Sequence, residues 1–90
     1  MDRFQEMQVF MAVAHDQGFA AAARRLGLSA ASVTRAVAAL EVRIGAQLLI
    51  RTTRAVQLTE AGQRYLEDCR RILADLQDAE ESAAGSHADP

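Results

Sequence analysis

The chain has 90 residues, half of them apolar, and its formal net charge at neutral pH is −2. This length predicts one small domain near the lower limit for a self-sufficient core, which further burial in a dimer would help. No stretch approaches the roughly 18 to 20 unbroken apolar residues of a membrane span, and the N-terminus lacks the pattern of a signal peptide. The single cysteine excludes an intrachain disulfide framework. We therefore expect a cytoplasmic protein with no membrane partner.

Charge is distributed unevenly along the chain. Residues 19–56 carry six arginines against one glutamate, a net charge of +5, whereas residues 57–90 carry eight acidic residues against three arginines, a net charge of −5. A basic middle followed by an acidic segment is typical of a phosphate-facing module joined to an element that faces away from nucleic acid. For Arg24 and Arg25 taken alone, a merely solvated basic surface is the alternative.

Apolar residues at helical spacing predict a first helix over about residues 3–16. A second helix begins at Phe19 and contains four consecutive alanines, which allow close packing against a neighbour. A turn follows, in which we expect Gly27 to adopt the left-handed conformation, Leu28 to enter the core and Ser29 to cap a third helix. This order of elements predicts a helix-turn-helix motif.

The third helix is expected to have an apolar side and, near its N-terminus, a polar side. The apolar side comprises Val33, Val37, Leu40 and Ile44. The opposite side comprises Ala31, Ser32 and Arg35, flanked by Thr34. Helices that read DNA present their base-contacting residues near the N-terminus, so this helix is predicted to enter the major groove.

From Gln47 to Thr59 the sequence changes to β-branched residues in rough alternation around a polar tip. This pattern predicts two short strands joined at residues 52–55, which we interpret as a wing. Thr59 is expected to cap a final helix. Gly62, inside that helix, indicates a close approach of its backbone to the core.

The final helix is expected to end near Ala84, and its apolar positions recur at alternating spacings of three and four. This coiled-coil-like seam predicts a dimerisation surface formed by Leu66, Cys69, Ile72, Leu73, Leu76 and Ala83, with Glu80 as a break. A helix of about 24 residues spans ~36 Å and would extend past so small a core. The alternative is that the seam packs onto the first helix of its own domain. We divide the chain into a DNA-binding domain (1–59), a dimerisation helix (60–84) and a hinge (85–90).

The sequence resembles the N-terminal domain of LysR-type transcriptional regulators over residues 3–84. The resemblance rests on FAAAARRLGLSAASVTRAVAALEVRIG followed by LLIRTTRAVQLTEAG. It implies a mainly α fold: a winged helix-turn-helix with a three-helix core, a two-stranded wing and a long C-terminal dimerisation helix. It also implies homodimers through that helix, tetramers of the full-length protein, and a small-molecule effector bound only by a C-terminal domain absent from this chain.

The resemblance assigns DNA contacts to the third helix and the wing. These contacts fall on Ala30, Ala31, Ser32, Thr34 and Arg35 in the helix, and on Arg51, Thr53 and Arg54 in the wing. Arg35 is the main candidate for a groove contact, because a guanidinium pairs bidentately with guanine or clamps a phosphate. Ser29, Ser32 and Thr34 are candidates to donate to phosphates, and Ser29 is also a cap. Many family members have Gln or Pro at positions 30 and 31, so an amide base contact is missing there.

We therefore expect a sequence-specific transcriptional regulator that binds an interrupted-palindrome operator in double-stranded DNA as a dimer. Two alternatives stay open: a winged-helix protein-interaction module without DNA binding, and a nonspecific nucleoid-type DNA binder. Two distant histidines and one cysteine make no metal site, and no catalytic constellation is present, so we expect no cofactor and no enzyme activity. Cys69 is interpreted as a small buried apolar residue of the dimer interface and not as a redox sensor.

Overall fold

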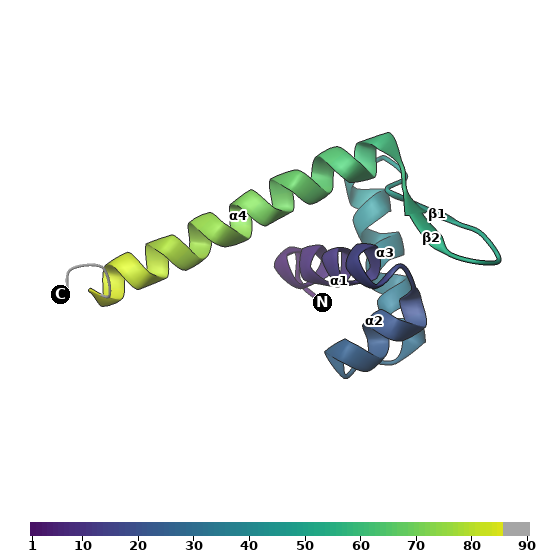
Figure 1. Cartoon of the computed structure of the whole chain (residues 1–90), viewed down its shortest axis with the longest axis horizontal. Helices are drawn as coiled ribbons and strands as arrows, with labels where there is room; N and C mark the ends of the chain where they lie inside the picture. Colours follow the sequence, from purple (N-terminus) through teal and green to yellow (C-terminus); the bar gives the residue numbers. More distant parts are fainter. Residues whose placement is uncertain (86–90) are drawn as a thin grey trace.

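The structure, a computed structural model, describes residues 1–85, so the predicted hinge lies outside the described residues except for Gly85. Helices α1 (Arg3–Asp16), α2 (Phe19–Leu26) and α3 (Ala30–Ile44) are followed by strands β1 (Leu49–Arg51) and β2 (Val56–Leu58) and by helix α4 (Glu60–Ala84). This order confirms the predicted mainly α winged helix-turn-helix. The first three helices and the hairpin gather at one end of the molecule, and α4 leads away from them (Figure 1).

Local capping signals explain where the helices begin and end. Asp2 and Gln5 form a reciprocal capping box at α1, with N···O distances of 2.7 and 3.0 Å between each backbone nitrogen and the other side chain. The Ser29 and Thr59 hydroxyls cap α3 and α4, each accepting one backbone N–H, at 3.0 and 2.9 Å. Gly27 ends α2 with φ of 71°, which confirms the predicted left-handed turn.

The core lies where α1, α2 and α3 meet, and the first turns of α4 close it. Phe10 on α1 and Tyr65 on α4 have ring centroids 5.3 Å apart, which joins the two helices directly. The largest fully buried side chains are Phe10, Leu40, Leu48, Val13, Val33 and Cys69. The core therefore draws on every helix and on the segment that enters the wing.

Two predictions about the core are wrong. Leu28 is 37% exposed, because its backbone N–H donates to the Ala23 carbonyl (2.9 Å) and the turn closes α2 without directing the side chain inward. Ile44 is 41% exposed, because it is the last residue of α3 and lies one turn beyond Leu40, the last buried residue of that helix. Leu48, which lies four residues after Ile44, is buried in the core instead.

The wing is an antiparallel hairpin in which Leu49 lies opposite Leu58 and Arg51 opposite Val56. It is seated closely on α4. A Cβ atom at Gly62 would lie 2.1 Å from the Leu48 carbonyl oxygen, so only glycine fits there. This confirms the predicted close approach of the helix backbone.

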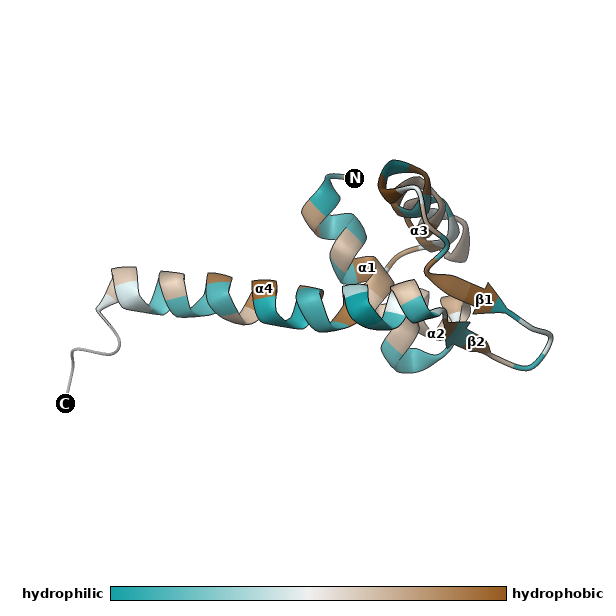
Figure 2. Cartoon of the chain, turned by 90° about the horizontal axis from the view of Figure 1, so that it is seen from above, coloured by the Kyte–Doolittle hydropathy of each residue, from teal (hydrophilic) through white to brown (hydrophobic). Residues whose placement is uncertain are grey.

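Helix α4 belongs to the core over its first part only. Leu66 and Cys69 are buried in the core of their own chain, as the alternative interpretation of the seam predicted, and they offer almost no surface to a partner. Farther along, Ile72 and Leu76 are 43% and 42% exposed. Figure 2 shows apolar residues recurring along one edge of the helix beyond the core. Among residues 1–85, no helix is long and apolar enough to cross a membrane.

Candidate nucleic-acid interface

The N-terminal turn of α3 carries most of the predicted helix contacts. Ser29, Ala30, Ala31 and Arg35 are exposed, and Ser32 is half-buried. The Ser29 hydroxyl donates to the Ser32 hydroxyl (2.9 Å), and the Arg35 guanidinium donates to the same oxygen (3.4 Å). The structure therefore brings Ser29, Ser32 and Arg35 together at a helix N-terminus, where backbone N–H groups and the helix dipole favour an anion.

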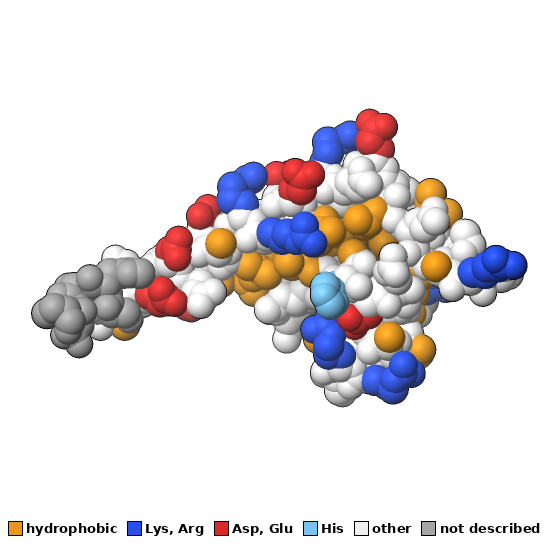
Figure 3. All heavy atoms as spheres, in the orientation of Figure 1, with side chains coloured by type: hydrophobic (Ala, Val, Ile, Leu, Met, Phe, Trp, Pro, Cys, Tyr) orange, Lys and Arg blue, Asp and Glu red, His pale blue; other side chains and the backbone are white. Residues whose placement is uncertain are grey.

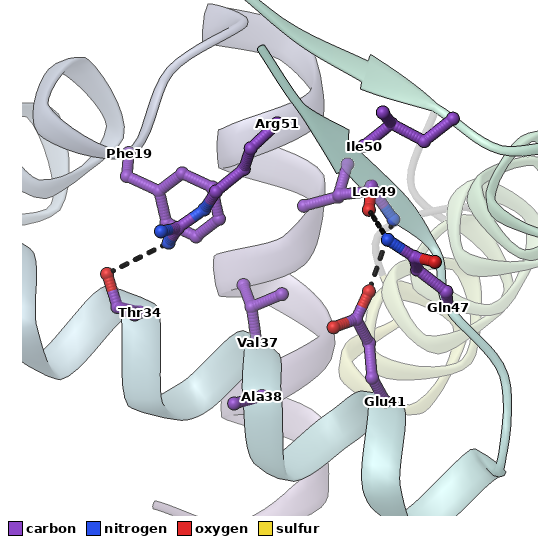
Figure 4. A pocket seen from close by; sticks show the side chains of 9 residues that line it. All are labelled: Phe19, Thr34, Val37, Ala38, Glu41, Gln47, Leu49, Ile50 and Arg51. Atoms are coloured by element: carbon purple, nitrogen blue, oxygen red, sulfur yellow. Dashed lines mark hydrogen bonds between the residues drawn. The ribbon is translucent and has the colours of Figure 1, made fainter. Parts of the chain in front are cut away.

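Arg51 lies against the third helix and the start of the second. Its guanidinium carbon is 3.8 Å from the centroid of the Phe19 ring, and one of its terminal nitrogens donates to the Thr34 hydroxyl at 3.2 Å. Figure 4 shows the guanidinium between these two side chains, at one end of a groove between α3 and β1. Arg51 thus joins the wing to α3, and Thr34 faces this arginine.

The tip of the wing is shaped by one side chain. The Thr52 hydroxyl donates to the Ala55 carbonyl (2.8 Å) and accepts the backbone N–H groups of Arg54 (3.3 Å) and Ala55 (3.0 Å). Thr53 and Arg54 are exposed. Within residues 1–85 the Arg54 side chain makes no hydrogen bond or ion pair, so its charge is available to a ligand.

Two other arginines of the basic segment are engaged in ion pairs. Asp16 accepts hydrogen bonds from His15 (2.9 Å) and Arg25 (3.0 Å), and these bonds lower the pKa of its carboxyl group. Arg43 pairs with the nearly buried carboxylate of Glu6 and ties α3 to α1. Both arginines therefore have structural partners, unlike Arg54.

The buried cysteine does not have the surroundings of a reactive thiol. Burial raises the pKa of the Cys69 thiol, and burial likewise raises the pKa of the neighbouring Tyr65 to about 12. A neutral, enclosed thiol is a poor nucleophile and metal ligand. No group of three or more histidine, cysteine, aspartate or glutamate side chains in the described part of the chain is placed to hold a metal ion.

The basic and acidic segments of the sequence lie on different parts of the molecular surface. Figure 3 shows acidic side chains along α4, interspersed with arginines, and a basic side chain at the tip of the wing. The two ends of the molecule therefore differ in the partners that they attract, with phosphates favoured at the helix-turn-helix and wing.

The sequence profile of the family described as "Bacterial regulatory helix-turn-helix protein, lysR family" matches residues 4–63. The chain belongs to the LysR family. This confirms the resemblance seen in the sequence and the expectation of a transcriptional regulator that is not an enzyme.

Relatives of this LysR-family chain include the transcriptional activator AaeR of Escherichia coli K12, 43% identical over 81 residues. That match covers 90% of this chain and 26% of AaeR, so the chain spans about a quarter of the relative's length. Among solved structures, the CbnR DNA-binding domain in complex with DNA is 40% identical, with a TM-score of 0.83, over 99% of this chain and all of that one.

A second solved structure is the BenM DNA-binding domain with catB site 1 DNA. It is 27% identical, with a TM-score of 0.85, and the match covers 99% of this chain and 98% of that one. The whole LysR-family chain therefore corresponds to domains that have been crystallised on DNA. It is the DNA-binding domain of a transcriptional regulator.

The contact between Phe19 and Arg51 was not predicted from the sequence. Side chains two residues apart in a strand share a face, so Arg51 lies on the same face of β1 as the buried Leu49. That face is directed toward the helices. The alternation of β1 was thus the available signal that Arg51 points inward, but it does not identify Phe19 as the side chain that it meets.

Proposed function

We propose that this LysR-family domain binds a two-fold, interrupted-palindrome operator as a dimer, with α3 in the major groove and the wing on the adjoining backbone. The contact between Arg51 and Thr34 supports this proposal most directly, because it ties the wing to the helix that presents Arg35. Helix and wing then approach DNA as one rigid surface, which lowers the entropic cost of binding.

The proposed contacts differ in kind. Arg35 reads a base edge or clamps a phosphate from within the groove. At the N-terminus of α3, Ser32 donates to the DNA backbone, and Ser29 does so by turning its single O–H away from the Ser32 hydroxyl. Arg51 and Arg54, with Thr53 between them in the sequence, reach phosphates or a narrow minor groove from the wing. Ala30 and Ala31 offer methyl groups only, so sequence discrimination depends strongly on Arg35.

The two-fold arrangement is proposed to come from the outer part of α4. Ile72 and Leu76 are large apolar side chains left more than two-fifths exposed by their own domain, with Leu73 and Ala83 on the same seam. Pairing of two such helices buries this surface and fixes the distance between the two copies of α3. Tetramers, a small-molecule effector site and a cytoplasmic location belong to the same proposal for the full-length regulator.

Selection of bound sequences from random duplex DNA, followed by salt titration of the best site, tests this function. We expect two-fold symmetric sites and an affinity that falls steeply with salt. Recovery of asymmetric sites would contradict the dimer, and equal affinity for random duplex would indicate a nucleoid-type binder. Absence of any binding would favour a protein-interaction module.

The substitution Arg35→Ala tests the central contact. Loss of a good guanidinium–base pairing weakens binding by about 5- to 150-fold, with an unchanged thermal unfolding curve. Arg71→Ala is the matched control, because it removes the same charge from an exposed position on α4, where Arg71 pairs with Asp68 at 3.0 Å. Equal operator affinities for the Arg35→Ala variant and the parent would show that Arg35 makes no contact with DNA that contributes to binding.

A further inference from the structure

We propose that Phe19 is a positioning residue for DNA binding, which holds the guanidinium of Arg51 in the orientation needed to contact a backbone phosphate. This inference rests on the proposed function, in which Arg51 touches DNA. Phe19 is the first residue of α2 and Arg51 the last of β1, so the pair joins elements 32 positions apart in the sequence.

Two contacts fix the plane of the guanidinium. The Phe19 ring, centred 3.8 Å from the guanidinium carbon, supports one face, and the Thr34 hydroxyl accepts one edge N–H at 3.2 Å. A guanidinium has five N–H donors. Because stacking uses a face and Thr34 accepts from one nitrogen, other edge donors remain for the bidentate geometry that phosphate oxygens favour.

The ring holds the arginine without neutralising it. A carboxylate in the same place would compete with phosphate for the guanidinium, whereas the negative face of an aromatic ring orients the cation and leaves its edge donors available. The acidic residue on the same groove is occupied elsewhere: Glu41 accepts the backbone N–H groups of Leu48 (2.7 Å) and Leu49 (3.2 Å). Arg51 makes no ion pair within residues 1–85.

Preorganisation gives the stack its effect on affinity. An unrestrained arginine loses rotamer freedom when it binds a phosphate, and that loss subtracts from the affinity. Two contacts, with the Phe19 ring and the Thr34 hydroxyl, already restrict the Arg51 side chain in the free protein. Removing the ring should therefore weaken DNA binding while the phosphate contact itself is still made.

The test combines Phe19→Leu, which keeps apolar bulk and removes the aromatic face, with Phe19→Tyr, which keeps the face. We expect Phe19→Leu to weaken binding to the selected operator about 2- to 5-fold, and Phe19→Tyr to bind like the parent. The slope of log affinity against log salt should stay unchanged in Phe19→Leu, because no phosphate contact is lost. It should fall by about 1 in Arg51→Ala.

The double variant separates positioning from a general effect on the fold. With Arg51→Ala already present, Phe19→Leu should cause no further loss of affinity. A full additional loss in that background, or parent-like binding of Phe19→Leu alone, overturns the inference. If Arg51→Ala itself leaves affinity and salt slope unchanged, the DNA contact of Arg51 in the proposed function fails and this inference fails with it. Thermal unfolding of each variant shows whether the fold is retained.

Discussion

Replacing Gly62 by alanine adds one methyl group at the point where α4 meets the wing. The new Cβ atom would lie 2.1 Å from the Leu48 carbonyl oxygen and 3.2 Å from a methyl group of Leu58. The carbonyl is held in place, because its oxygen accepts the Thr59 backbone N–H at 3.0 Å. The helix and the strand must therefore move apart.

Two effects of opposite sign set the size of the change. Alanine favours a helix over glycine by at most about 1 kcal/mol, whereas over-packing costs typically ~1–3 kcal/mol. Here a backbone atom obstructs the methyl group, so the upper end of that range applies. The net loss is about 2 kcal/mol in the free energy of unfolding, which lowers Tm by roughly 8–16 °C for a domain of this size.

Thermal and urea unfolding, followed by circular dichroism at one fixed protein concentration, measures this loss. Gln63→Ala is the matched control, because Gln63 is exposed in the same turn of α4, and its replacement should change stability by no more than about 0.5 kcal/mol. If Gly62→Ala is as stable as the parent, or more stable, helix propensity outweighs the contact and the reasoning from the close approach is refuted.

Three further predictions concern other parts of the molecule. Glu41→Ala leaves two backbone N–H groups at the entry to β1 without their acceptor. The substitution should lower the free energy of unfolding in urea by about 1–3 kcal/mol, and an unchanged unfolding midpoint would contradict this. Burial raises the pKa of Tyr65 to about 12, above an unfolded value of about 10. Its contribution to stability is therefore present below about pH 10 and lost as pH rises through about 12. Tyr65→Phe should flatten the alkaline part of the stability–pH profile, and an unaltered profile would exclude Tyr65 as the source of the loss. Leu76→Glu should shift the proposed dimer toward monomer in sedimentation, whereas Ala74→Glu, off the seam, should not. Equal association of both variants would contradict pairing through this seam.

Elements whose signals are local could be predicted from the sequence. Caps at Ser29 and Thr59, the left-handed glycine after α2 and the alternation of the wing each depend on neighbouring residues. The close approach at Gly62 was also predictable, since glycine within a helix is unfavourable unless space requires it. The helix boundaries therefore followed from the sequence, since α1 covers Arg3–Asp16 and α4 ends at Ala84 as predicted, whereas β1 begins at Leu49, two residues after the predicted start of the wing segment at Gln47.

Features that depend on where the core ends were not predictable in this way. Ile44 continues the apolar period of α3, but periodicity gives no information on how far neighbouring elements extend, and the residue is exposed. The seam of α4 has the same ambiguity, because Leu66 and Cys69 share the spacing of Leu76 yet face their own core. The contact of Arg51 with Phe19 joins β1 to the first residue of α2, and although the alternation of β1 indicates that Arg51 points inward, neither segment alone identifies its partner.

The burial of Leu66 and Cys69 shows that the folding unit extends past residue 59, where the predicted DNA-binding domain ends. A segment that stopped before α4 would lose these two side chains and the ring of Tyr65, which packs against Phe10. The first part of α4, as far as the partly buried Leu73, therefore belongs to the folding unit, whereas Ile72 and Leu76 are exposed. In the proposed dimer, one continuous helix contains both parts, so the position of the partner is tied to that of the core, and through Gly62 to that of the wing. Half-site spacing then depends on the contact at Gly62 as well as on the exposed seam.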